Sequence, residues 1–158
     1  KVYLGTVRIP LQFDIGFGDA VAPEPEMVVY PSMLSEVSPR IMAYPMVTMI
    51  AEKCAIMVEL GFANSRMKDF FDVWTVLNEF EISDEALKAA IAATFKRRGT
   101  RFDGTEPLCF SKEFSSDERK SIQWKAYLRK NGIVADCPSE FMEIAEFIAL
   151  KLRVLLPY

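Results

Sequence analysis

Histidine is absent from the sequence, and cysteine is scarce. Without an imidazole, these 158 residues cannot contain a Ser-His-Asp or Cys-His nucleophilic site, or a metal site with a histidine ligand. The cysteines Cys54, Cys109 and Cys137 are widely spaced, so they predict neither a zinc ribbon nor a disulfide framework. Chemistry in this chain would have to use carboxylates, lysine or the three thiols, and a reducing cytoplasm is the expected setting.

Long apolar runs are absent as well. The most apolar stretch, residues 147–156, is interrupted by Lys151 and Arg153 and is shorter than the roughly 20 residues that span a bilayer, so no membrane partner is expected. The chain also opens without a methionine, and residues 1–7 have the pattern of a strand already under way. We therefore expect a fragment of a protein that starts upstream of Lys1.

The composition is that of a folded domain. Hydrophobic residues make up 51% of the chain and charged residues 26%, which is enough to build a core at this length. The formal net charge of −3 hides a basic island at residues 94–130, with 10 basic and 5 acidic side chains. The island, which includes Arg97 and Arg98, predicts either a phosphate-attracting surface or a solvated helix face with favourable cations at a helix C-terminus.

The N-terminal part of the chain predicts a small sheet. Apolar and polar side chains alternate from Val7 to Ile15, which is typical of a half-buried strand. Pro10 removes one donor from the ladder and favours an edge position or a bulge. Extended pieces at residues 27–30 and 40–44 are each followed by proline and are expected to be further strands of the same sheet.

After Pro45 the pattern becomes helical. Five helices are expected: one capped by Thr48 and stopped by Gly61, one after Ser65 to about Phe80, one from Ser83 to Gly99, one from Ser116 to Gly132, and one from Ser139 to about Leu156. The predicted fold class is α+β, mainly α. It comprises a short sheet at residues 1–45 and a five-helix bundle at residues 46–158.

Two charged residues stand among apolar neighbours. Asp14 lies between Phe13 and Ile15, and a carboxylate projecting from a sheet is a natural Mg²⁺ ligand, although most such aspartates simply face water. Lys53 has apolar neighbours at helical spacing. Its side chain would either snorkel to water or reach over a cleft to a nucleotide phosphate as a point charge.

The third charged element opens the second expected helix. Asp69 and Asp72 are three residues apart and share a helix face, with Arg66 and Lys68 beside them. Acidic residues in a first helical turn interact favourably with the helix dipole. That interpretation explains Asp69 better than Asp72, which lies deeper in the helix.

Together these segments resemble the AbiEii/AbiGii toxin family of nucleotidyltransferases, which belongs to the DNA polymerase β-like superfamily. The segments that carry the resemblance are residues 11–19, Tyr44-Pro45, Ala51-Glu52-Lys53 and the run from Asn64 to Trp74. The family supplies toxins of abortive-infection and toxin–antitoxin systems. The resemblance covers residues 7–100 in detail, and it implies that the short sheet is a remnant of a nucleotidyltransferase core.

The resemblance also implies roles for single residues. Those expected in catalysis are Asp14, which would also bind metal, Lys53, Asp69 and Asp72. Arg66 and the neighbouring Lys68 are expected to bind substrate. Arg97 and Arg98 are expected to bind substrate as well, because they belong to the basic island, our hypothesis for the acceptor-binding face. The implied reaction moves a nucleotidyl group from a nucleoside triphosphate to an RNA acceptor, with tRNA the leading candidate. Mg²⁺ is the implied cofactor, and a cognate antitoxin is an implied partner.

One motif of the family is missing. No Gly-Ser turn followed by an Asp-x-Asp pair occurs in the sequence. Because two-metal phosphoryl transfer needs carboxylates that bridge both ions, this chain alone is expected to be inactive. The other hypothesis is a non-catalytic helical module that binds RNA or an antitoxin, for which the basic island predicts salt-dependent RNA binding without turnover.

Overall fold

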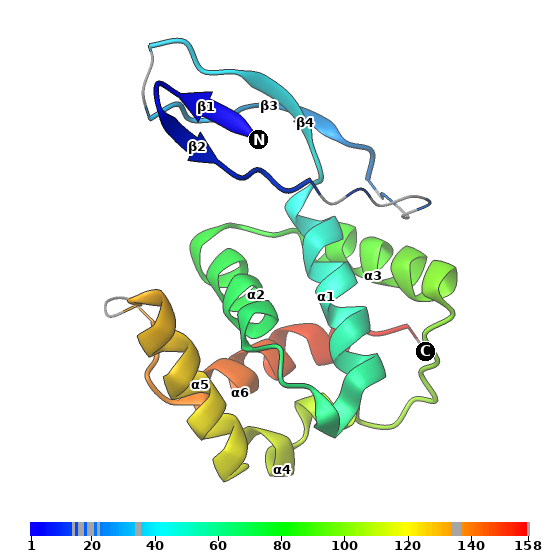
Figure 1. Cartoon of the computed structure of the whole chain (residues 1–158). Coiled ribbons are helices and arrows are strands. Elements are labelled where there is room, and N and C mark those ends of the chain that lie inside the picture. Colours follow the sequence, from blue (N-terminus) through cyan, green and yellow to red (C-terminus); the bar gives the residue numbers. More distant parts are fainter. Residues whose placement is uncertain are drawn as a thin grey trace.

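Two small hairpins precede a body of helices (Figure 1). The computed structural model describes residues 1–13, 15, 18, 21, 23–33, 36–133 and 137–157. Its strands are β1 (Val2–Leu4), β2 (Val7–Ile9), β3 (Glu26–Val29) and β4 (Arg40–Ala43), and its α-helices are α1 (Met46–Leu60), α2 (Met67–Glu79), α3 (Asp84–Arg98), α4 (Lys112–Ser115), α5 (Glu118–Asn131) and α6 (Phe141–Leu152). The fold is mainly α with a small β part, as predicted.

The strands form two separate antiparallel pairs within the described residues, so the single sheet expected from the sequence is wrong. In one hairpin Val2 pairs with Ile9, and in the other Glu26 pairs with Ala43. Strand β2 ends directly before Pro10, which has no N–H to donate to a ladder. The expected strand to Ile15 is therefore too long.

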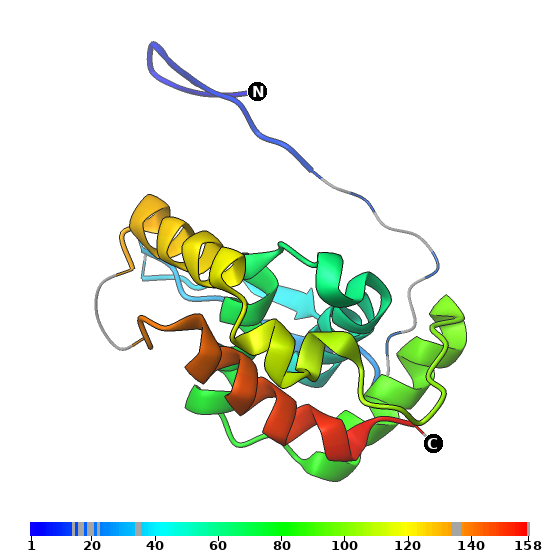
Figure 2. The same ribbon diagram turned by 90° about the horizontal axis from the view of Figure 1, so that it is seen from below.

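The expected half-burial of the first strand is also wrong. Val7 is 58% exposed and Ile9 is 41% exposed. A two-stranded hairpin buries an apolar face only when it packs against another element. Figure 2 shows the β1–β2 hairpin projecting away from the helices.

Four of the five predicted helix starts differ from the structure by one to three residues. Helix α1 begins at Met46, directly after Pro45, whose carbonyl accepts from the N–H of Thr48 at 3.0 Å. Thr48 is buried inside the first turn. Asp117 rather than Ser116 caps α5, since its carboxylate can accept from the N–H of Arg119 at 2.9 Å. The short α4, which ends at Ser115, was not predicted.

Two helix ends are confirmed. Gly99 after α3 and Gly132 after α5 have φ of 68° and 65°, the left-handed conformation that glycine adopts without strain. At the start of α3, the side chain of Ser83 accepts from the N–H of Ala86 at 3.3 Å. The capping serine, the acidic first turn, the basic last turn and the terminal glycine of α3 therefore all agree with the structure.

An aromatic core fixes the orientation of α2. The ring of Phe70 on α2 lies 5.2 Å from that of Phe141 on α6 and 5.7 Å from that of Phe114 on α4. All three side chains are fully buried or nearly so, and Trp124 of α5 closes the cluster. Helix α1 packs mainly on α3 and also contacts α2. Because its aromatic face is buried in this way, α2 turns its charged face toward α1.

Candidate active site

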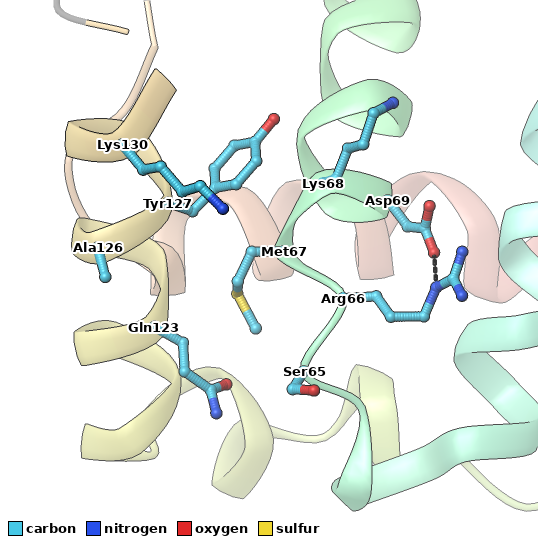
Figure 3. A pocket seen from close by; sticks show the side chains of 9 residues that line it. All are labelled: Ser65, Arg66, Met67, Lys68, Asp69, Gln123, Ala126, Tyr127 and Lys130. Atoms are coloured by element: carbon cyan, nitrogen blue, oxygen red, sulfur yellow. Dashed lines mark hydrogen bonds and ion pairs between the residues drawn. The ribbon is translucent and has the colours of Figure 1, made fainter. Parts of the chain in front are cut away.

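The candidate site begins at the first turn of α2. Arg66 Nε donates to Asp69 Oδ2 at 2.5 Å (Figure 3). The backbone N–H of Arg66 donates to the side-chain oxygen of Asn64 at 2.9 Å, and Asn64 is fully buried. The turn before α2 therefore places the guanidinium of Arg66 against Asp69, although 56% of the Arg66 side chain stays exposed.

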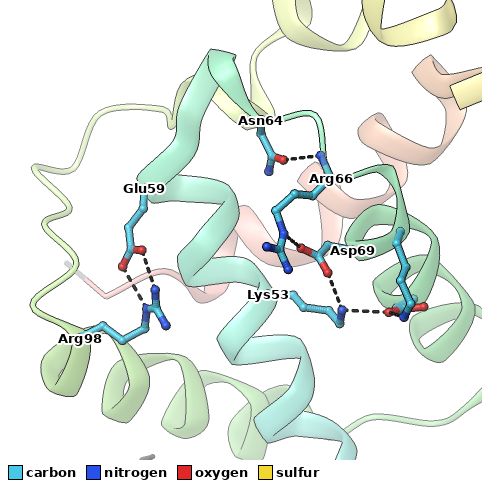
Figure 4. A network of polar contacts seen from close by, with 8 residues as sticks. Lys53, Glu59, Asn64, Arg66, Asp69 and Arg98 are labelled. Atoms are coloured by element: carbon cyan, nitrogen blue, oxygen red, sulfur yellow. Dashed lines mark hydrogen bonds and ion pairs between the residues drawn. The ribbon is translucent and has the colours of Figure 1, made fainter. Parts of the chain in front are cut away.

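Lys53 of α1 reaches across to two carboxylates of α2 (Figure 4). Its Nζ lies 2.6 Å from Asp69 Oδ1 and 2.8 Å from Asp72 Oδ2. The side chain is only 16% exposed, so the ammonium is held in place and does not snorkel freely to water. Lys68 adds a second cation to Asp72 at 2.6 Å. The structure thus joins four residues that the sequence predicted for one site, together with Arg66.

The carboxyl group of Asp69 is held in its ionised form at neutral pH. Burial of Asp69 opposes its ionisation, but hydrogen bonds from Arg66 and Lys53 outweigh burial and hold its pKa below the ordinary value of 3.8. The cluster then carries three cations against two carboxylates. The excess positive charge suits an anionic ligand such as a phosphate.

A cavity of about 300 Å³ opens beside Lys53. Its lining combines the charged cluster with aromatic, hydroxyl and apolar side chains, namely Tyr44, Thr48, Met49, Glu52, Lys53, Ile56, Arg66 and Asp69. Glu52 also lines the cavity, but its buried Oε1, which has no hydrogen-bond partner within the described residues, forms an ion pair with Arg97 Nη1 at 3.8 Å. The cavity therefore offers the cations Lys53 and Arg66 for phosphate.

A second concavity, which we call the α2–α5 groove, lies on the other side of Arg66 and Asp69. Its volume is about 500 Å³ (Figure 3). The residues that line it are Ser65, Arg66, Met67, Lys68, Asp69, Gln123, Ala126, Tyr127 and Lys130. The Arg66–Asp69 pair is thus part of the wall of both spaces.

Arg97 and Arg98 lie on a different face, where α3 packs on α1. Arg98 makes a two-pronged contact with Glu59, at 3.0 and 2.7 Å, and reaches Glu52 at 3.3 Å. Arg97 Nε donates to the carbonyl of Gly18 at 2.6 Å. In the part of the chain that the structure describes, both arginines contact the cavity-lining residue Glu52. Their expected role in acceptor binding stays a prediction.

Asp14 falls outside the described residues, so its expected role in catalysis and metal binding stays a prediction. The described part of the chain contains no group of three or more side chains suited to a metal ion. Asp69 and Asp72 are each bound to two cations, and such neutralised carboxylates are poor ligands for Mg²⁺. The described residues therefore do not fit a Mg²⁺ site.

A family model described as "Nucleotidyl transferase AbiEii toxin, Type IV TA system" matches residues 1–146, nearly the whole chain. The chain belongs to this AbiEii family. The match contains the entire Lys53–Asp72 cluster and both concavities. No curated protein and no solved structure matches the chain. Membership confirms the resemblance seen in the sequence, and with it the general assignment to nucleotidyltransferase toxins of toxin–antitoxin systems.

In this AbiEii chain, Lys120 is a supporting residue that sequence reasoning missed. Its Nζ donates to the carbonyls of Phe62 at 2.8 Å and Asn64 at 2.6 Å, and it lies 4.8 Å from the ring centre of Phe114. The residue is 5% exposed, and burial lowers its pKa. Lys120 therefore anchors the turn from which Arg66 emerges. No local signal distinguishes it from the other lysines of the basic island.

Tyr127 is a second residue near the cluster to which the sequence alone assigned no role in the site. Its ring stacks on Trp124 with centroids 5.6 Å apart. Burial raises the pKa of its phenol, with a further contribution from the charge of Asp72. The phenol therefore stays protonated at neutral pH and presents a donor beside the charged cluster.

The described helices of this family member include none long and apolar enough to cross a membrane.

Proposed function

We propose that the intact protein transfers a nucleotidyl group from a nucleoside triphosphate to an RNA acceptor, and that Lys53 contacts the triphosphate. The observation that carries this proposal is the position of Lys53 Nζ, 2.6 Å from Asp69 and 2.8 Å from Asp72, in the wall of a cavity of about 300 Å³. A lysine fixed by two carboxylates is pre-organised, so little side-chain entropy is lost when phosphate binds.

The proposed reaction forms one bond and breaks one. An acceptor hydroxyl oxygen bonds to the α-phosphorus and gives up its proton to solvent, while the bond to the bridging oxygen breaks and pyrophosphate leaves. Negative charge grows on the leaving group, and Lys53 and Arg66 are the described cations of the cavity wall that can meet it. Asp69 and Asp72 are proposed to position Lys53 rather than to bind metal.

The described residues provide no Mg²⁺ site, so no step is assigned to the ion here. Mg²⁺ remains part of the proposal as the cofactor of the whole reaction, because phosphoryl transfer needs neutralisation of the triphosphate. Its carboxylates would come from outside the described residues, with Asp14 as one candidate. We therefore expect residues 1–158 alone to be inactive.

An antitoxin completes the proposal. Membership of a toxin–antitoxin family makes a cognate antitoxin the expected protein partner. A cytoplasmic site of action is proposed from the sequence, whose three cysteines lack a disulfide pattern. The identity of the RNA acceptor, with tRNA the leading candidate, is likewise a proposal.

The test is incubation of the full natural protein with each α-³²P-labelled nucleoside triphosphate, Mg²⁺ and total RNA. The proposal expects label to enter an RNA species. If no nucleotide labels RNA while the protein still binds RNA, the hypothesis of a non-catalytic RNA-binding module replaces that of a nucleotidyltransferase. Labelling by residues 1–158 alone would contradict the requirement for further carboxylates.

A further inference from the structure

The α2–α5 groove has no role in the proposed binding of the triphosphate. It nevertheless shares Arg66 and Asp69 with the cavity that holds Lys53. A transfer reaction needs two substrates whose reacting ends meet. Residues of α1 line the cavity together with the shared pair. Residues of α5 line the groove together with the same pair (Figure 3). The arrangement therefore separates two binding spaces by a single ion pair.

We infer that the α2–α5 groove binds the terminal nucleotide of the RNA acceptor; this inference rests on the proposed function. The lining of the groove includes the apolar side chains of Met67 and Ala126 and the aromatic residue Tyr127. It also includes Lys130 and Lys68, whose side chain is 71% exposed and pairs with Asp72. A lining that combines apolar and aromatic side chains with exposed cations matches a base attached to a phosphodiester.

A buried amide oxygen supplies a more specific feature. Gln123 Oε1 has no hydrogen-bond partner within the described residues, although it is shielded from solvent. Buried polar atoms are normally paired, so an orphan acceptor in a concave wall favours a ligand with a matching donor. An exocyclic amine of a base or a ribose hydroxyl would supply one.

The ring of Tyr127 is held rigidly for this role. It stacks on Trp124 at 5.6 Å, and it lies 5.8 Å from the ring of Phe71. A fixed aromatic ring binds a base with little loss of conformational entropy. The same features distinguish the groove from a site for an acidic peptide, which needs cations but neither an aromatic ring nor an amide acceptor.

The direct test measures binding of a short fluorescein-labelled single-stranded RNA by the full natural protein at several salt concentrations. Lys130→Ala should weaken binding about fivefold and reduce the slope of log affinity against log salt by about one. Gln123→Leu should weaken binding with the slope unchanged. Lys125→Ala is the matched control, because Lys125 is on the same helix but pairs with Glu140 at 2.9 Å and does not line the groove.

Each outcome decides the inference. Equal RNA affinity and equal slope for Lys130→Ala and Lys125→Ala would overturn it, and so would a polyglutamate competitor that displaces the RNA as well as unlabelled RNA does. In the transfer assay, Lys130→Ala should raise KM for RNA and leave KM for the nucleotide unchanged. If the wild-type protein binds RNA through Lys130 but transfers no nucleotide, the proposed function is refuted. The assignment of the groove to RNA binding would then still stand.

Discussion

The ammonium of Lys53 and the carboxylate of Asp69 lie 2.6 Å apart, although 16 residues separate them in the chain. Their contact ties α1 to the first turn of α2. Asp69 simultaneously binds Arg66, so one nearly buried carboxylate orients two cations of the proposed triphosphate site. The predictions below follow from this contact and from the residues that support it.

Asp69→Asn should lower the free energy of unfolding by about 2 kcal/mol, because the hydrogen bonds from Lys53 and Arg66 lose their anionic acceptor. The loss is limited because Lys53 retains its ion pair with Asp72. Urea denaturation monitored by circular dichroism measures the change. Lys68→Ala is the control, since that lysine is 71% exposed and its ion pair should contribute no more than about 0.5 kcal/mol. Equal losses for the two variants would contradict the special position of Asp69.

The stability of the wild-type protein should depend on the pH through Asp69. Its pKa in the folded state is held below 3.8, whereas the unfolded chain has the ordinary value, so the unfolded state binds the proton more readily. The stabilisation is complete above the unfolded pKa and is lost as the pH falls through the folded pKa. Urea midpoints measured from about pH 5 downward should therefore fall less steeply for Asp69→Asn than for wild type. Parallel pH profiles would refute the role of the carboxylate.

Lys120→Met should destabilise the protein by about 2 kcal/mol, because it leaves the carbonyls of Phe62 and Asn64 without a donor. Hydrogen exchange of the amides at residues 62–66 should accelerate more than exchange in α3. Lys125→Met provides the matched control on the same helix, with its lysine 55% exposed. Unchanged exchange at residues 62–66 would show that Lys120 does not anchor the turn before Arg66.

Thiol reactivity should separate the three cysteines. Burial raises the pKa of Cys109 to about 12 and raises that of the fully buried Cys54 further, so neither forms thiolate at neutral pH. Burial raises the pKa of Cys137 as well, but this residue is partly exposed. Brief treatment with iodoacetamide followed by mass spectrometry should find label on Cys137 first and on the other two after unfolding. Early labelling of Cys54 would contradict the packing of α1.

The helical body and the charged cluster were largely predictable, because their signals are local. Asp69 and Asp72 share a face at a spacing of three, and both indeed contact Lys53. Gly99 and Gly132 end helices for the steric reason that the sequence indicates. The contact of Lys53 with that face joins two helices, so periodicity within one helix could not predict it.

The remaining features depend on contacts between distant residues. Lys120 is buried only because carbonyls 58 and 56 residues away accept its hydrogen bonds. Alternation along residues 7–15 predicts a buried face, but burial requires a partner surface, and Val7 and Ile9 stay exposed in the described structure. Gln123 and Lys130 line the α2–α5 groove because the fold places α5 beside the first turn of α2, which no local pattern predicts.

Single-turnover transfer from a labelled nucleoside triphosphate to RNA by the full natural protein tests the central claim most directly. Lys53→Ala should slow transfer by about 100-fold, which corresponds to about 2.7 kcal/mol of lost transition-state stabilisation. Lys88→Ala, which removes an exposed lysine of α3, should transfer at the wild-type rate. A Lys53→Ala rate within twofold of wild type would contradict the assignment of Lys53 to the triphosphate.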